Sequence, residues 1–273
     1  MEAASVWFEW NWAPSILLGL ALLTGLYLYA AGPGRRWFAE SAPVRPAQLA
    51  WFLGGVVVLF LALVSPLDSL SDGYLFTAHM WQHFMLAFLA PPCLLLGTPE
   101  WLLRPLLRRP ALAWALRQLT APLFAYAAFN IFFIAWHLPA LYEATLHNEA
   151  IHIFEHLLFI TTGVLNWWPV MSPLPELQRL TYPGRIFYLF LEVIPTSVMG
   201  AFVTFPATVL YPTYANAPRV LNLSPMEDQQ FAGLIMWIPA AFIYLFALSI
   251  VFMSWFSREQ KAEAARPAPP RNV

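Results

Sequence analysis

All six histidines of the chain lie between His79 and His156, and four of them form two His-x-x-x-His pairs. The pairs are His79 with His83 and His152 with His156. Side chains at this spacing project from the same face of a helix. Both pairs lie in strongly apolar segments, where an imidazole without a partner is costly. Histidines can also hydrogen-bond across a helix bundle, but two such pairs favour a metal site.

Imidazole is a common protein ligand of copper, zinc, iron and nickel. Three methionines near the same side of the predicted membrane, Met80, Met199 and Met226, favour copper, because thioether sulfur suits the cuprous ion. We therefore predict copper, with zinc or haem as alternatives, and place Met199 beside the ligands. His137 is a candidate fifth ligand, whereas we expect His147 to be a solvated loop residue.

Acidic side chains are expected next to the histidines. Glu155 precedes His156, and we predict that Glu155, Glu192 and Asp228 support the ligands. A carboxylate near the middle of a membrane span is costly unless it is used. We therefore interpret Glu192 as a proton carrier or as the partner of a ligand histidine, the alternative being a hydrogen bond that locks helices. Asp228 is equally suited to a helix N-terminus.

The composition indicates an all-α integral membrane protein. Hydrophobic residues make up 60% of the chain, charged residues 11%, and the mean hydropathy is +0.60, far from the balance of soluble domains. A membrane-spanning helix needs about 20 apolar residues. Runs of this length predict a seven-span bundle, over 14–31, 48–66, 75–97, 119–138, 149–168, 184–206 and 229–256.

The basic residues indicate the orientation of these spans. Thirteen of the fourteen Lys and Arg residues fall in connections on one side of the predicted membrane or in the C-terminal tail, and only Arg219 falls on the other. The positive-inside rule then predicts an external N-terminus and a cytoplasmic C-terminus. This orientation puts all six histidines in the extracytoplasmic half. A net charge of -1, without a basic and aromatic patch, indicates no nucleic-acid partner.

The connecting segments add further expectations. We predict an interfacial helix over 100–118, a lid or docking loop over 207–227, a single domain over 1–257 and a disordered cytoplasmic tail over 258–273. The charge order around the first span does not suit a cleavable signal peptide. Cys93, the single cysteine, excludes an intramolecular disulfide and a Cys-x-x-Cys site.

Several motifs in this order resemble the polytopic CtaG family of cytochrome c oxidase (caa-type) assembly factors. They are His79-Met-Trp-Gln-His83, Ala90-Pro-Pro92, Leu96-Gly-Thr-Pro99, Trp136-His-Leu-Pro139 with Tyr142, His152-x-x-x-His156, Trp168-Pro169, Asp228-Gln-Gln230, Ala232-Gly233 and Met236-Trp237. The resemblance covers about residues 50–256. It implies a multi-pass protein of the bacterial cytoplasmic membrane, needed for maturation of a haem-copper oxidase.

The predicted function is therefore assembly of that oxidase, with copper held by His79, His83, His152, His156 and His137 and delivered to an oxidase subunit. The expected partners are oxidase subunits and the lipid bilayer, and a homo-oligomer is compatible with the sequence. No catalytic nucleophile stands out, so we do not expect an enzyme.

Three alternatives remain open at this point. A seven-span zinc hydrolase of the ceramidase-like type would need about three ligands, an open water position and an acidic base such as Glu155 or Asp228. A b-type haem protein would use one histidine from each of two helices per haem. A scaffold without metal would only chaperone oxidase subunits.

Overall fold

The computed structural model describes residues 5–38, 40–177 and 180–265, and every regular element within them is helical. The longer elements are α2 (Pro14–Ala31), α3 (Pro46–Leu63), α5 (Phe76–Phe84), α6 (Ala90–Gly97), α8 (Pro110–Leu119), α9 (Pro122–Trp136), α11 (Glu149–Met171), α12 (Tyr182–Thr204) and α14 (Pro225–Ala264). The shorter ones are η1 (Val6–Phe8), η2 (Pro33–Trp37), α4 (Pro66–Ser71), η3 (Met85–Leu89), α7 (Glu100–Leu103), η4 (Arg104–Arg108), α10 (Pro139–His147) and α13 (Pro212–Asn216).

Prolines and polar caps determine where many of these helices begin. A proline stands in the first turn of α2, α3, α9, α10 and α14, where its missing N–H costs nothing and its fixed φ suits the helix. Helix α11, which follows α10 directly, starts instead at Asn148. The Asn148 side chain accepts hydrogen bonds from the N–H groups of Ala150 and Ile151, at 3.0 and 3.2 Å.

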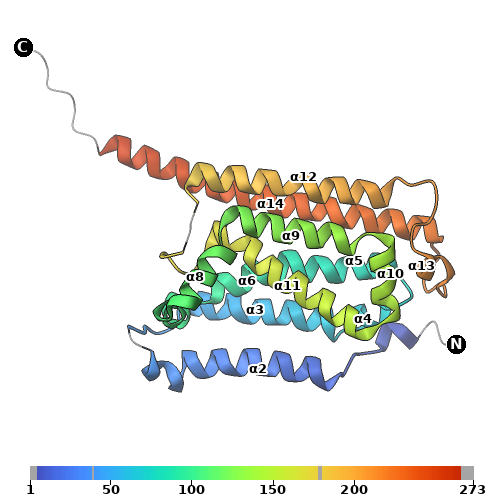
Figure 1. Cartoon of the computed structure of the whole chain (residues 1–273), viewed down its shortest axis with the longest axis horizontal. Coiled ribbons are helices and arrows are strands. Elements are labelled where there is room, and N and C mark those ends of the chain that lie inside the picture. Colours follow the sequence, from blue (N-terminus) through green and yellow to red (C-terminus); the bar gives the residue numbers. More distant parts are fainter. Residues whose placement is uncertain (1–4, 39, 178–179, 266–273) are drawn as a thin grey trace, which may run out of the picture.

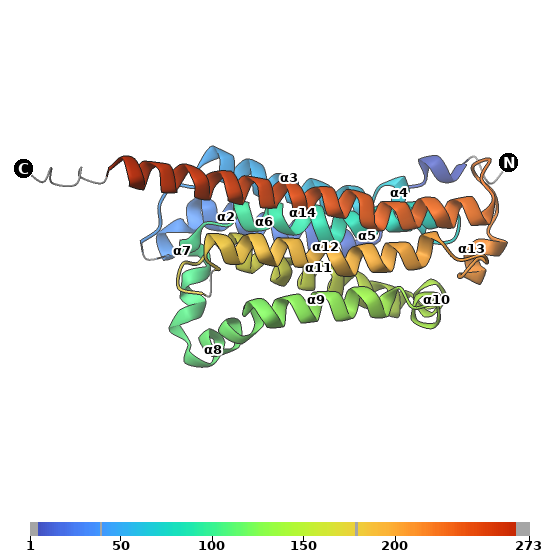
Figure 2. The same ribbon diagram turned by 90° about the horizontal axis from the view of Figure 1, so that it is seen from above.

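The long helices run side by side along the longest axis of the molecule (Figure 1). Helix α14 packs along α12 and α5, α11 packs along α9, η3 and α6, and α3 packs along α6. Helix α2 lies at one edge of the bundle and contacts η2 and α3. Seen from above, α14 projects beyond the other helices at the end opposite the N-terminus (Figure 2).

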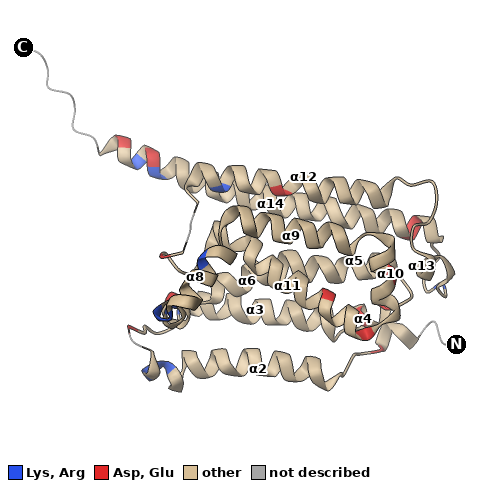
Figure 3. Cartoon of the chain, viewed as in Figure 1, with Lys and Arg blue, Asp and Glu red and all other residues tan. Residues whose placement is uncertain are grey.

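The two ends of the bundle differ in their charged residues. Helices α4, α10 and α13 lie at the end that carries the N-terminus, which we call the histidine end. Helix α8 and the last turns of α14 lie at the opposite end, the arginine end. Most of the basic residues gather at the arginine end, and acidic residues lie at α4 and in the first part of α11 (Figure 3). This distribution agrees with the asymmetry expected from the sequence.

In the described part of the chain, five helices, or six if a bent pair counts as one span, are long and apolar enough to cross a membrane. The bent pair is α8 with α9, which meet at 63°. Helix α11 occupies the predicted fifth span, and its 23 residues are about 34 Å long. It carries Glu155, His152, His156 and Asn166, which lower its hydropathy. The count of seven spans therefore stays a prediction, as does the orientation of the termini.

Two segments outside the predicted spans differ from what the sequence predicts. The predicted interfacial helix over 100–118 is divided into α7, η4 and α8, because Pro105 and Pro110 interrupt it. The expected tail begins as a continuation of α14 to Ala264, and residues 266–273 lie outside the described residues. The loop over 207–227 contains the short helix α13.

A close contact brings the two histidine-bearing helices together. The predicted third span consists of α5, the π-helical turn η3 and α6. Pro91 and Pro92 have no N–H groups to donate to the turn before them. Gly163 of α11 lies against this turn, and a Cβ atom there would stand 2.9 Å from the Ala87 carbonyl oxygen and from Pro91 Cγ. Glycine at position 163 therefore lets α11 approach η3 and α6, the continuation of α5, closely.

Candidate metal centre

Four buried side chains converge between α5 and α11. His79 and His83 lie one turn apart on α5, with Nε2 atoms 2.8 Å from each other. Glu155 and His156 face them from α11. One ligand atom from each of the four residues lies within 4.8 Å of all the others. Three imidazoles and one carboxylate thus form a compact group inside the bundle.

The dimensions of this group fit a metal ion. Copper or zinc binds imidazole nitrogen and carboxylate oxygen at roughly 2.0–2.2 Å, so that ligand atoms around one ion stand about 3–4 Å apart. The Nε2 atoms of His79 and His83 are closer than this, and Glu155 Oε2 is 3.6 Å from His83 Nε2. Shifts of about 1 Å or less would bring the four atoms to such distances. The donor set suits copper or zinc.

Hydrogen bonds determine which nitrogen of His79 is free. Tyr214 of α13 donates its hydroxyl proton to the Ser71 carbonyl oxygen, at 2.7 Å. Its oxygen also lies 3.1 Å from His79 Nδ1. Because the hydroxyl has only one proton, Nδ1 of His79 must be the donor in the second bond. Nε2 of His79 then carries a lone pair directed at the group, as metal-binding histidines require.

Several buried acceptor atoms of the group have no hydrogen-bond partner. These atoms are both carboxylate oxygens of Glu155, Nε2 of His156 and Nδ1 of His83. Glu155 has 0% of its surface exposed. A buried carboxylate without donors is strongly unfavourable unless a positive charge compensates it. The sequence predicts that Glu155 supports the metal ligands. In the structure, its carboxylate belongs to the group of four itself.

The remaining predicted ligands stand next to the group. The ring of His152 lies 4.2 Å from that of His156 and 5.5 Å from that of His79. His137, the C-cap of α9, has its ring 5.9 Å from that of His83. The Nε2 atoms of His152 and His137 are buried and have no partner. His147 is exposed, with its Nε2 3.8 Å from a carboxylate oxygen of Glu143, as expected for a solvated residue.

Asp228 determines the position of α5. Its two carboxylate oxygens accept hydrogen bonds from the N–H groups of Phe76 and Thr77, at 2.9 and 3.0 Å. These N–H groups open α5 and have no partner inside the helix. The negative charge is also favourable at a helix N-terminus. Asp228 thus ties the start of α14 to the helix that carries His79 and His83, and its support of metal ligands stays a prediction.

Aromatic side chains cover the group at the histidine end. Phe76, Tyr142, Tyr211 and Tyr214 are fully buried there and contact one another. The Tyr211 hydroxyl donates to the His137 carbonyl oxygen at 2.7 Å. Sequence reasoning did not assign Tyr211 and Tyr214 to the site. The signal for them was the length of the loop over 207–227, which was expected to be a lid or a docking surface.

A polar network extends from α5 to α4. Gln82 donates to the Ala62 carbonyl oxygen and to Asp68 Oδ1, at 3.0 and 2.6 Å, and accepts from the Ser71 hydroxyl at 2.9 Å. Asn11 also donates to Asp68, at 2.6 Å. Burial, and then the neighbouring carboxylate of Asp72, raise the pKa of Asp68 to about 6. Gln82 was overlooked although it lies between His79 and His83 in the sequence.

Glu192 belongs to a different buried polar cluster. Its carboxylate accepts from Asn130 Nδ2 of α9 at 3.1 Å. Near it, Tyr188 donates to Asn166 Oδ1 at 2.6 Å, and Asn166 Nδ2 donates to Tyr244 at 3.0 Å. Asn130 lies two helical turns from His137 along α9, a separation of about 10 Å. The structure thus places Glu192 apart from the histidines, and its role in supporting them stays a prediction.

Met199, expected beside the ligands, is buried in the hydrophobic core of the bundle, as are Met80 and Met236. The core itself can account for these methionines, because the flexible thioether fills gaps between helices. Copper ligation by Met199 therefore stays a prediction.

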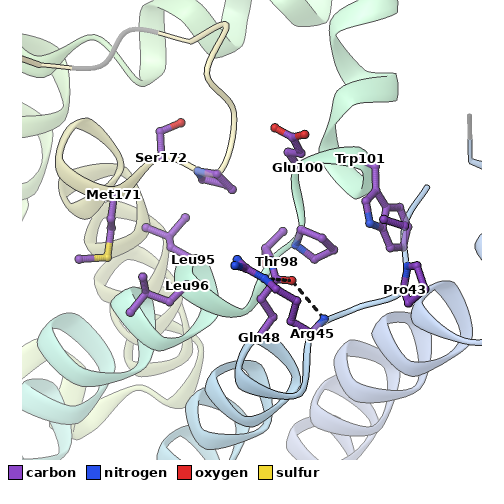
Figure 4. Close-up of a pocket in the computed structure, with 13 residues that line it drawn as sticks. Pro43, Arg45, Gln48, Leu95, Leu96, Thr98, Glu100, Trp101, Met171 and Ser172 are labelled. Atoms are coloured by element: carbon purple, nitrogen blue, oxygen red, sulfur yellow. Dashed lines mark hydrogen bonds between the residues drawn. The ribbon is translucent and has the colours of Figure 1, made fainter. Parts of the chain in front are cut away.

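A cavity of about 420 Å³ lies at the other end of the bundle (Figure 4). Its charged lining residues are Arg45 and Glu100, and Arg45 Nε donates to Gln48 Oε1 at 3.3 Å. No histidine lines this cavity. Among the described residues, the side chains that could hold a metal ion form the group between α5 and α11.

Comparison with known proteins agrees with this arrangement. The model of the family described as cytochrome c oxidase caa3 assembly factor (Caa3_CtaG) matches residues 25–258, which include every residue of the candidate site. The chain belongs to this family. The resemblance noted in the sequence is thus confirmed. The description of the family names assembly of cytochrome c oxidase as its role.

Mycobacterial proteins are similar to the chain over most of its length. It is 26% identical to the uncharacterized proteins Mb0105 of Mycobacterium bovis and MT0111 of Mycobacterium tuberculosis, in an alignment of 272 positions that covers 93% of this chain and 40% of each relative. It is 24% identical to the uncharacterized protein ML1998 of Mycobacterium leprae, with the same coverage. The chain thus spans about 40% of the length of these curated relatives. No solved structure matches it.

The position of Asp228 leads to a first prediction. We expect Asp228→Ala to lower both thermal stability and metal affinity, because α5 loses its N-terminal acceptor. The loss of a helix cap costs about 1 kcal/mol. The matched control is Glu227→Ala, which removes the capping box that Glu227 forms with Ser224 on α14. It should lower stability without changing metal affinity. Thermal unfolding and metal titration of the purified variants measure both effects, and unchanged affinity in Asp228→Ala would contradict this account.

The two buried glutamates give a second prediction. Glu155→Gln should lower metal affinity by about tenfold or more, because it removes the negative charge beside the imidazoles. Glu192→Gln is the same change in an equally buried carboxylate and should leave metal affinity unaltered. Competition with a chelator of known affinity measures both variants. A stronger loss in Glu192→Gln than in Glu155→Gln would show that the wrong carboxylate has been assigned to the site.

Proposed function

We propose that this protein binds copper in the group formed by His79, His83, Glu155 and His156 and delivers it to a haem-copper oxidase during assembly. The observation that carries this proposal is the buried Glu155 carboxylate, without a hydrogen-bond donor, among three imidazoles with lone pairs. When bound, copper would be the cargo of the site. His152 and His137, at its margins, are further candidate ligands.

The properties of the site suit a carrier. Imidazole and carboxylate ligands bind copper less strongly than thiolates, so the ion can be exchanged with a partner. Tyr214 holds the Nδ1 proton of His79 and thereby orients its ring. The aromatic cover of Tyr142, Tyr211 and Tyr214 excludes water from the group. Opening of the loop that carries Tyr211 and Tyr214 would expose it to an oxidase subunit.

Zinc is the alternative that the donor set supports. Three imidazoles and a carboxylate also bind zinc, and a carboxylate beside a zinc-bound water acts as a base in hydrolases. A bound haem would give strong absorption in the Soret region. Elemental analysis together with an absorption spectrum of the purified protein therefore distinguishes copper, zinc and haem.

The orientation of the bundle is part of the proposal. We place the histidine end outside the cytoplasm, because the basic residues gather at the arginine end (Figure 3). A fluorescent protein that matures only in the cytoplasm should fluoresce when it is fused after Val273. A periplasmic reporter at the same position should be inactive. The opposite pattern in a well-expressed fusion would place the histidine end on the cytoplasmic side and would contradict delivery from outside.

The site itself leads to a prediction on metal content. Changing His79, His83 and His156 together to Ala should abolish copper retention after purification, because three of the four ligands are removed. The control is His147→Ala, which alters an exposed histidine at the same end and should retain copper. The measurement is copper per protein by mass spectrometry, with thermal unfolding to establish that each variant is folded. Full copper content in the folded triple variant would refute the site.

A further inference from the structure

A cavity of about 570 Å³ opens beside the candidate metal centre, between α2, α3 and α11. Its inner wall is apolar and includes Leu20, Leu59 and Leu157. Its polar lining residues belong to the histidine end and are Asn11, Ser15, Asp68, Asp72, Glu149, His152 and His156. No lysine or arginine lines it. The cavity therefore combines negative charge with two of the histidines already described.

The exposure of these polar residues decreases from the mouth of the cavity inward. Glu149 is exposed, and the Asp72 side chain has 48% of its surface exposed. The His152 side chain is 14% exposed, and its Nδ1 lies 3.5 Å from Asp72 Oδ1. His156 is 8% exposed. Polar side chains thus line the cavity from its mouth to the interior group.

Acidic residues at a surface do not by themselves indicate an ion-binding site. Here a second observation points to a ligand, because the nearly buried His156 lines the same cavity while its Nε2 has no partner. The Nε2 of His152 is likewise buried and without a partner. Since Nδ1 of His152 faces a carboxylate, it keeps its proton, and Nε2 carries the lone pair.

We propose that this cavity is the port through which the metal centre is loaded, and that Asp72, Glu149 and His152 form a transient cation site at its mouth. This inference rests on the proposed function. A copper ion first binds the two exposed carboxylates and His152. It then exchanges these ligands for His156, whose ring is 4.2 Å from that of His152. The step transfers the ion by ligand exchange, without a change of oxidation state.

The ligands at the mouth indicate which form of copper enters. Carboxylate oxygen and imidazole nitrogen suit the divalent ion, whereas the cuprous ion prefers thiolate and thioether sulfur. The lining of the cavity contains neither cysteine nor methionine. The port therefore takes Cu²⁺ and not Cu⁺.

The experiment measures the rate at which the metal-free protein takes up Cu²⁺, followed by stopped-flow quenching of tryptophan fluorescence. Asp72→Asn with Glu149→Gln should slow uptake by about tenfold or more and flatten its dependence on ionic strength, because the attracting charges are lost. The copper content at equilibrium should reach that of the wild type, because the interior ligands are intact. The control is Glu9→Gln, which removes an exposed charge at the same end outside the cavity lining.

A steric variant tests the route independently. Gly19 of α2 lines the cavity, and a Cβ atom at this position would have no neighbour within 4 Å. Gly19→Phe should therefore place a ring in the cavity and slow uptake. Gly25→Phe is the matched control, because Gly25 lies on the same helix, is equally open and does not line the cavity.

The outcomes separate the port from the proposed function. If the wild type takes up no copper at all, the proposed function fails. If the wild type loads but the double variant loads at the same rate with the same salt dependence, the port is refuted while the metal centre stands. Full-rate loading of Gly19→Phe would also refute the route, and faster uptake of Cu⁺ than of Cu²⁺ would refute the assigned form of copper.

Discussion

The arrangement depends on one electrostatic constraint, a buried carboxylate without hydrogen-bond donors among imidazoles. Glu155 has no exposed surface, and neither of its oxygens has a hydrogen-bond partner. In an interior of low dielectric such a group is tolerated when a cation or a proton compensates its charge. Because the imidazoles of His79, His83 and His156 converge on the same place, a metal ion that displaced the proton shared by His79 and His83 would satisfy all four residues together. A proton would satisfy only the carboxylate.

Distant parts of the chain hold this group together. Asp228 fixes the start of α5, and Tyr214 fixes the proton of His79, each by hydrogen bonds across more than 130 residues of sequence. Gly163 lets α11 approach the turn after α5. The ligands are thus positioned by the bundle as a whole.

Much of the fold and part of the candidate site could be predicted from the sequence. The spans were predictable because apolar runs of the required length are interrupted by prolines and charges, and α2 begins and ends where expected. The two histidine pairs predicted the site because spacing by four residues is a helical property. Glu155 was recognised only as a neighbour, and Gln82 and Tyr214 were missed. Their roles depend on contacts between segments far apart in the chain, which helical periodicity does not encode. The same limitation applied to Glu192, whose burial was predicted but whose partner, Asn130, was not.

The coordination of copper in the purified protein tests the central claim most directly. X-ray absorption spectroscopy at the copper edge reports the elements bound to the ion and their distances. The account predicts nitrogen and oxygen ligands at about 2.0 Å, with the outer-sphere scattering of about three imidazole rings and no sulfur. A sulfur ligand would mean that a methionine or Cys93 binds the copper ion, which contradicts the assigned ligands. A folded protein that cannot be loaded with copper would contradict the metal centre itself.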